Sequence, residues 1–391
     1  MIPPVMPTYA RADVAFERGE GPYLVTDGGE RYLDFSSGIA VTSLGHAHPH
    51  LVAAVKRQAD KLWHTSNLYR IPEQERLAER LVANSFAATV FFANSGAEAL
   101  ECSIKVARKY QAAIGMPERY RVVTFEGAFH GRTLATLAAG AQEKHLEGFG
   151  PAVEGFDQVA WGDVGGARAA IGERTAAILV EPIQGEGGVR MPAKDFLRAL
   201  RDLADDKGVL LLVDEVQTGM GRTGRLFAHE HFGFAPDVAA IAKALGGGFP
   251  IGACLATEKA AQGMTAGSHG STFGGNPLAA AAANAVLDVM LADEFFDHVA
   301  AMNRRLMAGV EGIARRYQGV IGEVRGLGLL VGMRCVGTNG ELVDALRARK
   351  LLAVPAGDNV VRFLPPLIVE ESHVDEALDK LGDACRELAA R

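Results

Sequence analysis

Cysteine is scarce in this sequence of 391 residues, and the spacing of the few that occur excludes two classes of protein. The four cysteines, Cys102, Cys254, Cys335 and Cys385, lie far apart, and no C-x-x-C pair is present. This pattern predicts neither a disulfide-rich scaffold nor a cysteine-ligated zinc site. We therefore expect reduced thiols in a cytoplasmic protein.

An excess of positive charge is also missing. The chain has 40 lysines and arginines against 47 aspartates and glutamates, which gives a formal net charge of −7 at pH 7. A protein whose main function is to bind nucleic acid usually has the opposite balance. The first residues show no basic segment followed by an apolar one, so we expect no secretory signal.

Long uncharged apolar runs are absent too. The one stretch that could mislead a hydropathy scan, residues 238–256, contains Lys243 and three consecutive glycines. A membrane helix would have to insert that charge at a cost of about 2.5–3.5 kcal/mol. We expect instead two buried strands around a glycine turn, with the lysine in apolar surroundings.

What the chain does have is an alternation of short apolar runs and helical patterns between residues 85 and 260. Continuous apolar strands separated by helices predict a mostly parallel sheet that is covered on both faces. The architecture is therefore expected to be α/β. The predicted strands are ATVFFAN, RVVTFEG, TAAILVEP, VLLLVDEV and DVAAIAKA.

The character of the sequence changes after about residue 275. Residues from 276 onward are Ala-rich and helical, and they lead into a small α+β domain. The first 45 residues are strand and turn material that could pack on either domain, and we assign them to the small one. We thus predict an N-terminal segment (1–45), a large domain (46–275), and a linking helix with a small C-terminal domain (276–391).

The stretch NSGAE (residues 94–98) connects an apolar strand to a helix. Ser95 and Glu98 fit the capping box S-x-x-E, so Ser95 can simply be a helix cap. Gly96 and Ala97, however, leave the first N–H groups of the helix uncovered at the end of a strand, where a phosphate group can bind. Both interpretations of this motif stay open.

Asp214 ends a fully apolar strand. A buried carboxylate needs a partner, so Asp214 either caps a loop or faces a cationic or protonatable group in a cleft. The stretch GMGRTG (residues 219–224) then matches G-x-G-x-x-G. A dinucleotide-binding fold would continue with a helix and a second strand, and the residues that follow are too few for both. We therefore do not favour a nicotinamide-dependent oxidoreductase.

Lys243 follows a short strand and is surrounded by small and apolar residues. Burial would lower the pKa of its amine and free a nucleophile. The alternative is a surface lysine whose amine reaches solvent. Arg132 and Arg362 stand among apolar or small residues and suit bidentate binding of carboxylates. Phe129 offers a flat face.

These features together fit one cofactor. Pyridoxal 5'-phosphate needs an anion cradle, a lysine for a covalent bond, and a carboxylate that keeps its ring nitrogen protonated. A metal site is not predicted, because Pro49 interrupts the alternating histidines of GHAHPH (residues 45–50) and no carboxylate or cysteine cluster supports them.

Over essentially its whole length the chain resembles the class-III pyridoxal-phosphate-dependent aminotransferases, and most closely those of the acetylornithine branch in arginine biosynthesis. The resemblance implies the type I pyridoxal-phosphate transferase fold, in which the large domain binds the cofactor. It also implies a homodimer with shared active sites. The motifs that carry it are NSGAEA, FHGRT, EPIQGEGG, LLLVDEVQTGMGRTG, AKALGGGFPIGA and STFGGNPLA.

The resemblance also implies roles for residues at the cofactor. Lys243 would bond covalently to it and would transfer protons as the catalytic base and acid. Asp214 would pair with the pyridine nitrogen, Gln217 would lie near the ring hydroxyl, and Phe129 would stack on the ring. The residues implied to hold the phosphate are Ser95, Gly96, Ala97 and Thr272 of the partner subunit.

At the substrate, the resemblance implies that Arg132 binds the α-carboxylate, with Ser271 nearby. In relatives a glutamate at the position of Glu186 can pair with an arginine at that of Arg362, and the binding of glutamate then frees the arginine for the α-carboxylate. The implied reaction is ping-pong. It moves the ω-amino group of N2-acetylornithine to 2-oxoglutarate and yields N-acetylglutamate 5-semialdehyde and glutamate.

Neighbouring ω-aminotransferases remain alternatives, because a few side chains and the partner's loops set the specificity of such pockets. Their substrates would be ornithine, succinylornithine, succinyldiaminopimelate or 4-aminobutyrate. A non-catalytic binding protein of the same fold is not favoured, since Lys243, Asp214 and Arg132 occur together.

Overall fold

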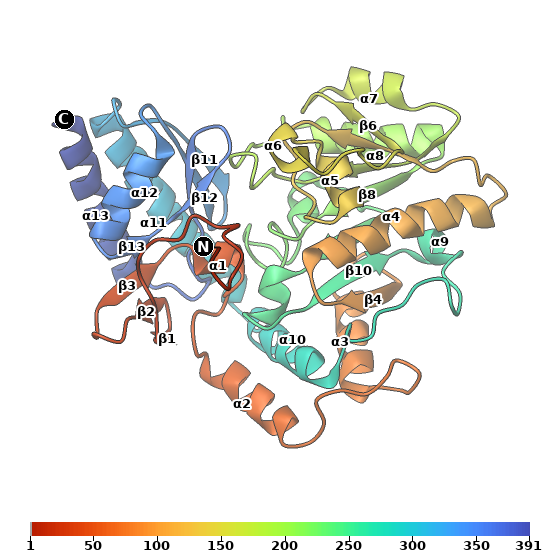
Figure 1. The fold of residues 1–391 in the computed structure, drawn as a ribbon, viewed down its shortest axis with the longest axis horizontal. Helices are drawn as coiled ribbons and strands as arrows, with labels where there is room; N and C mark the ends of the chain where they lie inside the picture. Colours follow the sequence, from red (N-terminus) through yellow and green to blue (C-terminus); the bar gives the residue numbers. More distant parts are fainter. Residues whose placement is uncertain (1) are drawn as a thin grey trace.

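The computed structural model, which describes residues 2–391, shows a large and a small domain side by side (Figure 1). The large domain is built on a seven-stranded sheet in the order β4-β10-β9-β8-β7-β5-β6. Its neighbouring strands are parallel except at β10, which runs against both β4 and β9. The predicted mostly parallel α/β sheet is therefore confirmed. The strands are β4 (Thr89–Ala93), β5 (Arg121–Phe125), β6 (Phe156–Val159), β7 (Thr175–Val180), β8 (Leu210–Asp214), β9 (Val238–Ile241) and β10 (Gly252–Ala256).

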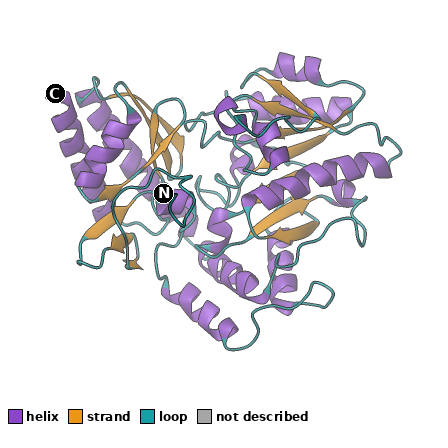
Figure 2. Cartoon of the chain, in the orientation of Figure 1, coloured by secondary structure: helices purple, strands orange, loops and turns teal. Residues whose placement is uncertain are grey.

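Helices cover both faces of this sheet (Figure 2). Successive side chains of a strand point to opposite faces, so Val122 packs in the buried cluster around α4 and Val123 packs in the cluster around α8. The edge strand β6 was not predicted, because its sequence FDQV is half polar. The helices are α4 (Gly96–Ala113), α5 (Leu134–Gly140), α6 (Glu143–Leu146), α7 (Val164–Ala170), α8 (Phe196–Lys207) and α9 (Glu258–Ala261).

The Ala-rich segment after residue 276 forms two helices rather than the single long one that we expected. The first, α10 (Pro277–Met290), is buried along nearly its whole length and packs on α2 (Pro49–Ala59) and α3 (Pro72–Ala83). The second, α11 (Phe295–Arg316), packs in the small domain. Between them Glu294 has a φ of 67°, a left-handed conformation that a helix cannot continue. The break lets the two helices pack on different neighbours, although their buried side chains join one continuous hydrophobic core.

The small domain contains two four-stranded sheets. One is antiparallel in the order β11-β12-β15-β14, and α11 and α12 pack on it. In the other, the N-terminal strands β1, β2 and β3 are joined by β13 (Leu351–Leu352), which runs parallel to β3. The domain boundaries stay a prediction. The remaining bounds are β1 (Arg18–Glu20), β2 (Tyr23–Val25), β3 (Arg31–Asp34), β11 (Ile321–Leu327), β12 (Leu330–Cys335), β14 (Val354–Ala356), β15 (Val360–Phe363), α12 (Asn339–Ala348) and α13 (Glu371–Ala389).

Residues 238–256 form β9 and β10, and the short turn η2 (Lys243–Gly246) lies between them, so the two predicted strands around a glycine turn are confirmed. Two further short turns are α1 (Ser37–Ala40) and η1 (Ala228–Phe232).

Within residues 2–391 no helix is long and apolar enough to cross a membrane. Over the same range no three potential metal ligands gather, and His46 hydrogen-bonds to Asp34.

Candidate active site

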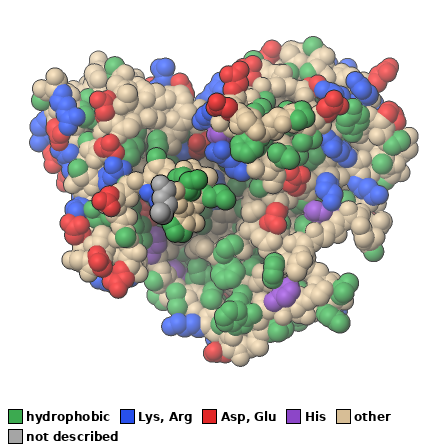
Figure 3. Space-filling view, in the orientation of Figure 1, with side chains coloured by type: hydrophobic (Ala, Val, Ile, Leu, Met, Phe, Trp, Pro, Cys, Tyr) green, Lys and Arg blue, Asp and Glu red, His purple; other side chains and the backbone are tan. Residues whose placement is uncertain are grey.

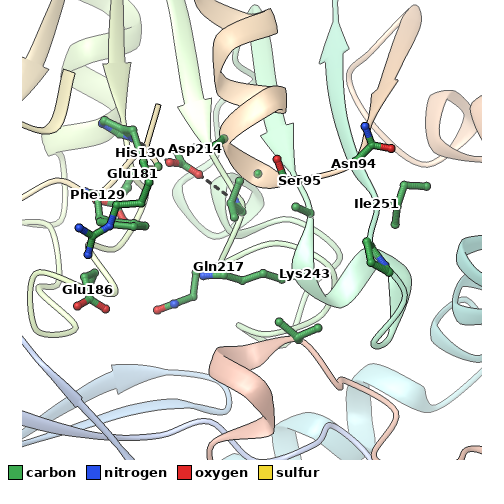
Figure 4. Close-up of a pocket in the computed structure, with 18 of the residues that line it drawn as sticks. Asn94, Ser95, Phe129, His130, Glu181, Glu186, Asp214, Gln217, Lys243 and Ile251 are labelled. Atoms are coloured by element: carbon green, nitrogen blue, oxygen red, sulfur yellow. Dashed lines mark hydrogen bonds and ion pairs between the residues drawn. The ribbon is translucent and has the colours of Figure 1, made fainter. Parts of the chain in front are cut away.

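A cavity of about 420 Å³ opens at the carboxyl ends of β4, β5, β7, β8 and β9. This edge faces the small domain, and the molecule is visibly hollowed between the two domains (Figure 3). Open α/β sheets bind ligands at this edge, because the loops that follow parallel strands converge there. Figure 4 shows the labelled side chains around the cavity, which end or follow β4, β5, β7 and β8 or lie in the turn between β9 and β10.

The NSGAE stretch forms the helix cap that its sequence allowed, and it also lines the cavity. Ser95 caps α4, because its Oγ accepts the N–H of Glu98 at 3.2 Å. Gly96 and Ala97 form the first turn of α4, where N–H groups have no intrahelical acceptor, and both residues line the cavity. A Cβ atom at Gly96 would lie 2.7 Å from Cγ1 of Val216. Position 96 therefore has no room for a side chain, and the small residues of this turn leave its N–H groups open to a phosphate group.

Asp214 faces a protonatable partner, as one of its two interpretations predicted. Its Oδ2 lies 2.8 Å from Nδ1 of His130, and its Oδ1 accepts the N–H of Val216 at 3.0 Å. Both side chains are buried, with 4% and 3% exposure. Among the described residues Nε2 of His130 has no partner. The sequence analysis assigned no role to His130, although it lies inside the motif FHGRT between Phe129 and Arg132.

Lys243 lines the same cavity from the end of β9. Burial by the surrounding protein, helped by the positive charge of Arg362, lowers the pKa of its amine to about 8 from the usual 10.5. Asp214 opposes this shift. The backbone of Lys243 has a φ of 45°, a strained conformation that is found most often at functional sites. The structure thus places an amine of lowered pKa beside the buried acid, and the surface alternative does not hold.

Glu181 is a buried carboxyl group that the sequence analysis did not single out. It follows β7, and Val180 pairs in register with Val213, so Glu181 and Asp214 leave the sheet side by side. Its Oε2 accepts the N–H of Phe129 at 3.1 Å. Burial and the negative charge of Asp214 raise its pKa well above the usual range. Glu181 therefore anchors the loop that carries the Phe129 ring into the cavity.

Two arginines serve the cavity in different ways. Arg132 is exposed and lines it, and no carboxylate in the described chain lies within ion-pair distance of its guanidinium group. Arg362 lies behind the wall with no exposed surface, and its Nη2 donates to Oε2 of Glu186 at 2.7 Å. Its Nη1 donates to Oε1 of Gln217 at 3.1 Å. One cationic site is thus free and the other is neutralised.

Ser271 and Thr272 do not line this cavity, and Thr272 was predicted for the site of the partner subunit rather than for that of its own chain. Ser271 lies near the rim of the cavity, where its Oγ accepts the N–H of Gly274 at 2.9 Å and a weak 3.4 Å contact from Asn94. Thr272 is exposed and does not line the cavity. The other predicted site residues line the cavity or, like Arg362, contact residues that do.

Comparisons with known proteins agree with this geometry. A family model described as aminotransferase class-III matches residues 6–385. The acetylornithine aminotransferase of Agrobacterium fabrum is 60% identical over 388 residues, which are 99% of this chain and 97% of that protein. The succinylornithine transaminase/acetylornithine aminotransferase of Pseudomonas aeruginosa is 43% identical, over 98% of this chain and 95% of that one.

A solved structure has the same fold. The ornithine aminotransferase of Toxoplasma gondii superimposes with a TM-score of 0.94 at 31% identity, covering 99% of this chain and 94% of that one. That structure was described as having partial occupancy of pyridoxal phosphate at its active site. Because it covers 99% of this chain, the resemblance in fold includes both the large and the small domain.

Proposed function

This chain belongs to the class-III aminotransferases, and from that premise we propose that it transfers the ω-amino group of N2-acetylornithine to 2-oxoglutarate. The products are N-acetylglutamate 5-semialdehyde and glutamate, and the reaction is a step of arginine biosynthesis. The observation that supports this choice of substrate is the 60% identity to an acetylornithine aminotransferase over nearly the whole of both chains. The enzyme is a pyridoxal-phosphate-dependent transaminase with the type I fold of that class.

The residues of the cavity fit the cofactor. The side-chain-free first turn of α4 suits its phosphate, and the buried carboxylate of Asp214 suits its ring nitrogen. Phe129 supplies a flat face and Gln217 a hydrogen-bonding group. When bound, pyridoxal phosphate supplies an electron sink that stabilises negative charge on the substrate carbon.

Lys243 is the residue that we expect to act on the reacting atoms. Because its pKa is lowered to about 8, roughly a tenth of the amine is unprotonated at neutral pH, far more than for an ordinary lysine, and this form can attack a carbonyl carbon. The same Nζ atom can then take a proton from the carbon that bears the amino group and return it elsewhere, as a general base and acid. Asp214 is held by two hydrogen bonds, so its carboxylate stays oriented during these steps.

The two arginines explain how one pocket takes two kinds of substrate. Arg132 would bind the α-carboxylate of N2-acetylornithine, while Glu186 keeps the charge of Arg362 neutralised. A dicarboxylate would displace Glu186 and use Arg362 as a second site. Glu186 is suited to move, because its side chain is 31% exposed against 1% for that of Arg362.

We also propose that the enzyme is a cytoplasmic homodimer. Large apolar side chains are exposed on the segment before α3 and beside Thr272, and apolar surface of this kind is typical of subunit interfaces. Thr272 would then bind the phosphate in the partner's site. The four free cysteines suit a reducing compartment. The exposed apolar residues are Leu62, Trp63, Leu68, Tyr69 and Phe273.

A second candidate substrate is succinylornithine, because a relative at 43% identity carries both activities in its name. Ornithine, succinyldiaminopimelate and 4-aminobutyrate are further candidates of the same reaction type. All of them would use the same cofactor and Lys243, so they differ only in how the cavity receives the far end of the substrate.

The decisive experiment uses the purified enzyme with bound cofactor and no keto acid. N2-acetylornithine, succinylornithine and ornithine are added separately, and the conversion of the cofactor is followed by its visible absorbance. Fast conversion by N2-acetylornithine with much slower conversion by ornithine supports the proposal. Preference for another amine would reassign the substrate, and absence of any cofactor absorbance after loading would refute the site itself.

A further inference from the structure

Arg222, in the middle of the GMGRTG stretch, is fully buried and has no carboxylate partner within the described residues 2–391. Its Nη1 donates to the carbonyl oxygens of Leu329 at 2.8 Å and Pro365 at 2.7 Å. Burial lowers its pKa to about 9, so the group still carries its charge at neutral pH. A buried charge is expensive to desolvate, and here two neutral carbonyls compensate it only in part, because Nε and Nη2 have no partner among residues 2–391. The cavity does not use this residue.

The two carbonyls lie at one end of a strand pair. Leu329 stands just before β12, and Pro365 follows β15. These strands are antiparallel, with Gly332 opposite Arg362, so the start of β12 and the end of β15 coincide. A single guanidinium group therefore holds both strands at the end that is close to Arg362.

The loop that carries Arg222 also contacts Arg362 directly. Gln217, in the same loop after β8, accepts a hydrogen bond from Nη1 of Arg362 at 3.1 Å. The base of the loop is rigid, because the buried Glu215 accepts hydrogen bonds from Thr218 and His229. The loop thus connects the large-domain sheet to the strand of Arg362 twice, once through Gln217 and once through Arg222.

The backbone of this loop packs directly against the backbone of the turn between β11 and β12. The N–H of Leu329 donates to the carbonyl oxygen of Arg222 at 3.0 Å. A Cβ atom at Gly328 would lie 2.4 Å from the carbonyl carbon of Thr223, and one at Gly221 would lie 2.8 Å from Leu367. Gly221 of GMGRTG and Gly328 of the small domain therefore permit close packing between the domains, which gives Gly221 a purpose other than binding a dinucleotide.

We propose that Arg222 is a positioning residue, which clamps the end of the β12–β15 pair to the loop after Asp214 and thereby fixes the guanidinium group of Arg362 at the cavity. This inference rests on the proposed function, in which Arg362 binds a carboxylate of glutamate and 2-oxoglutarate. In the half-reaction with N2-acetylornithine, Arg362 stays paired with Glu186. That half-reaction therefore depends less on where Arg362 is placed. Loss of the clamp therefore weakens one half-reaction selectively.

The experiment measures the two half-reactions separately on the holoenzyme. Arg222→Met removes both hydrogen bonds at similar volume, and Arg222→Lys retains the charge but lacks the planar donor geometry. The glutamate concentration for half-maximal rate is expected to rise about tenfold or more in Arg222→Met, and less in Arg222→Lys. The corresponding value for N2-acetylornithine is expected to change less than about twofold.

Asn303→Ala is the matched control. Asn303 on α11 donates to the carbonyl oxygen of Gly328, so this variant loosens the same β11–β12 turn from within the small domain and leaves the loop contact intact. A selective glutamate defect in either Arg222 variant, absent from Asn303→Ala, supports the proposal. Equal losses in both half-reactions, or none, overturn it, and Arg222→Lys decides if Arg222→Met fails to fold. Failure of the wild-type enzyme to react with N2-acetylornithine would instead refute the proposed function.

Discussion

The pair of His130 and Asp214 allows a quantitative test of the cofactor site. His130→Phe keeps an aromatic ring of similar size and removes the Nδ1 donor, which lies 2.8 Å from Oδ2 of Asp214. Asp214 is 4% exposed, so water cannot replace the lost hydrogen bond without rearrangement. A hydrogen bond to a charged group contributes about 1.5–3 kcal/mol. The free energy of unfolding of the cofactor-free protein should fall by about that amount.

Cofactor affinity should fall as well, because the carboxylate that we propose for the ring nitrogen is then held only by the N–H of Val216. The contact at stake in binding is the charged hydrogen bond between this carboxylate and the ring nitrogen, and its loss, about 1.5–3 kcal/mol, corresponds to a weakening of Kd by roughly ten- to a hundredfold. Titration of the cofactor-free protein with pyridoxal phosphate, followed by visible absorbance, measures this value. Urea unfolding of the same preparation measures the stability.

The chain offers a matched control for this prediction. His229 forms a similar buried pair with Glu215 at 3.0 Å, outside the cavity. His229→Phe should lose stability and retain cofactor affinity. Wild-type affinity in His130→Phe would refute the reasoning, and so would an equal loss of affinity in both variants.

Further predictions concern Lys243 and the cradle. Lys243→Ala should fold normally, as circular dichroism can check, but lack the absorbance of the covalently bound cofactor; an unchanged visible band would mean that another lysine forms the bond. Folding lowers the pKa of Lys243 from 10.5 to about 8. Between these two pH values the unfolded chain binds one proton more than the folded one, so the free energy of unfolding should rise with pH across that window. Lys243→Met should lack this slope, and an identical pH dependence in both proteins would contradict the pKa shift. Gly96→Val should weaken cofactor binding by about tenfold or more, because its side chain meets Val216 at the phosphate cradle; unchanged titration of this variant would place the phosphate elsewhere.

Several features of the site could be predicted from single stretches of sequence. Ser95, Asp214 and Lys243 each follow an apolar run directly, and the carboxyl ends of parallel strands meet at one edge of a sheet. Strand identity and strand direction therefore sufficed to bring these three residues together. The glycines at positions 96 and 246–248 marked the turns, because their effect on the backbone is local.

Contacts between distant segments were decided only by the tertiary structure. His130 reaches Asp214 across 84 residues of sequence, and Arg362 reaches Gln217 and Glu186 across 145 and 176 residues. Nothing in the sequence near Arg222 indicated that it would bind two carbonyls of the other domain. The tertiary structure also decided the break between α10 and α11, since local helix propensity continues through this segment.

The sequence by itself thus determined the class of fold and the chemistry available at each strand end, because backbone preferences and the alternation of apolar residues act over a few neighbours. The tertiary structure decided which charges are paired, which are free and how the small domain is held against the cavity. These outcomes depend on long-range packing and on the burial of each group, which no short stretch of sequence contains.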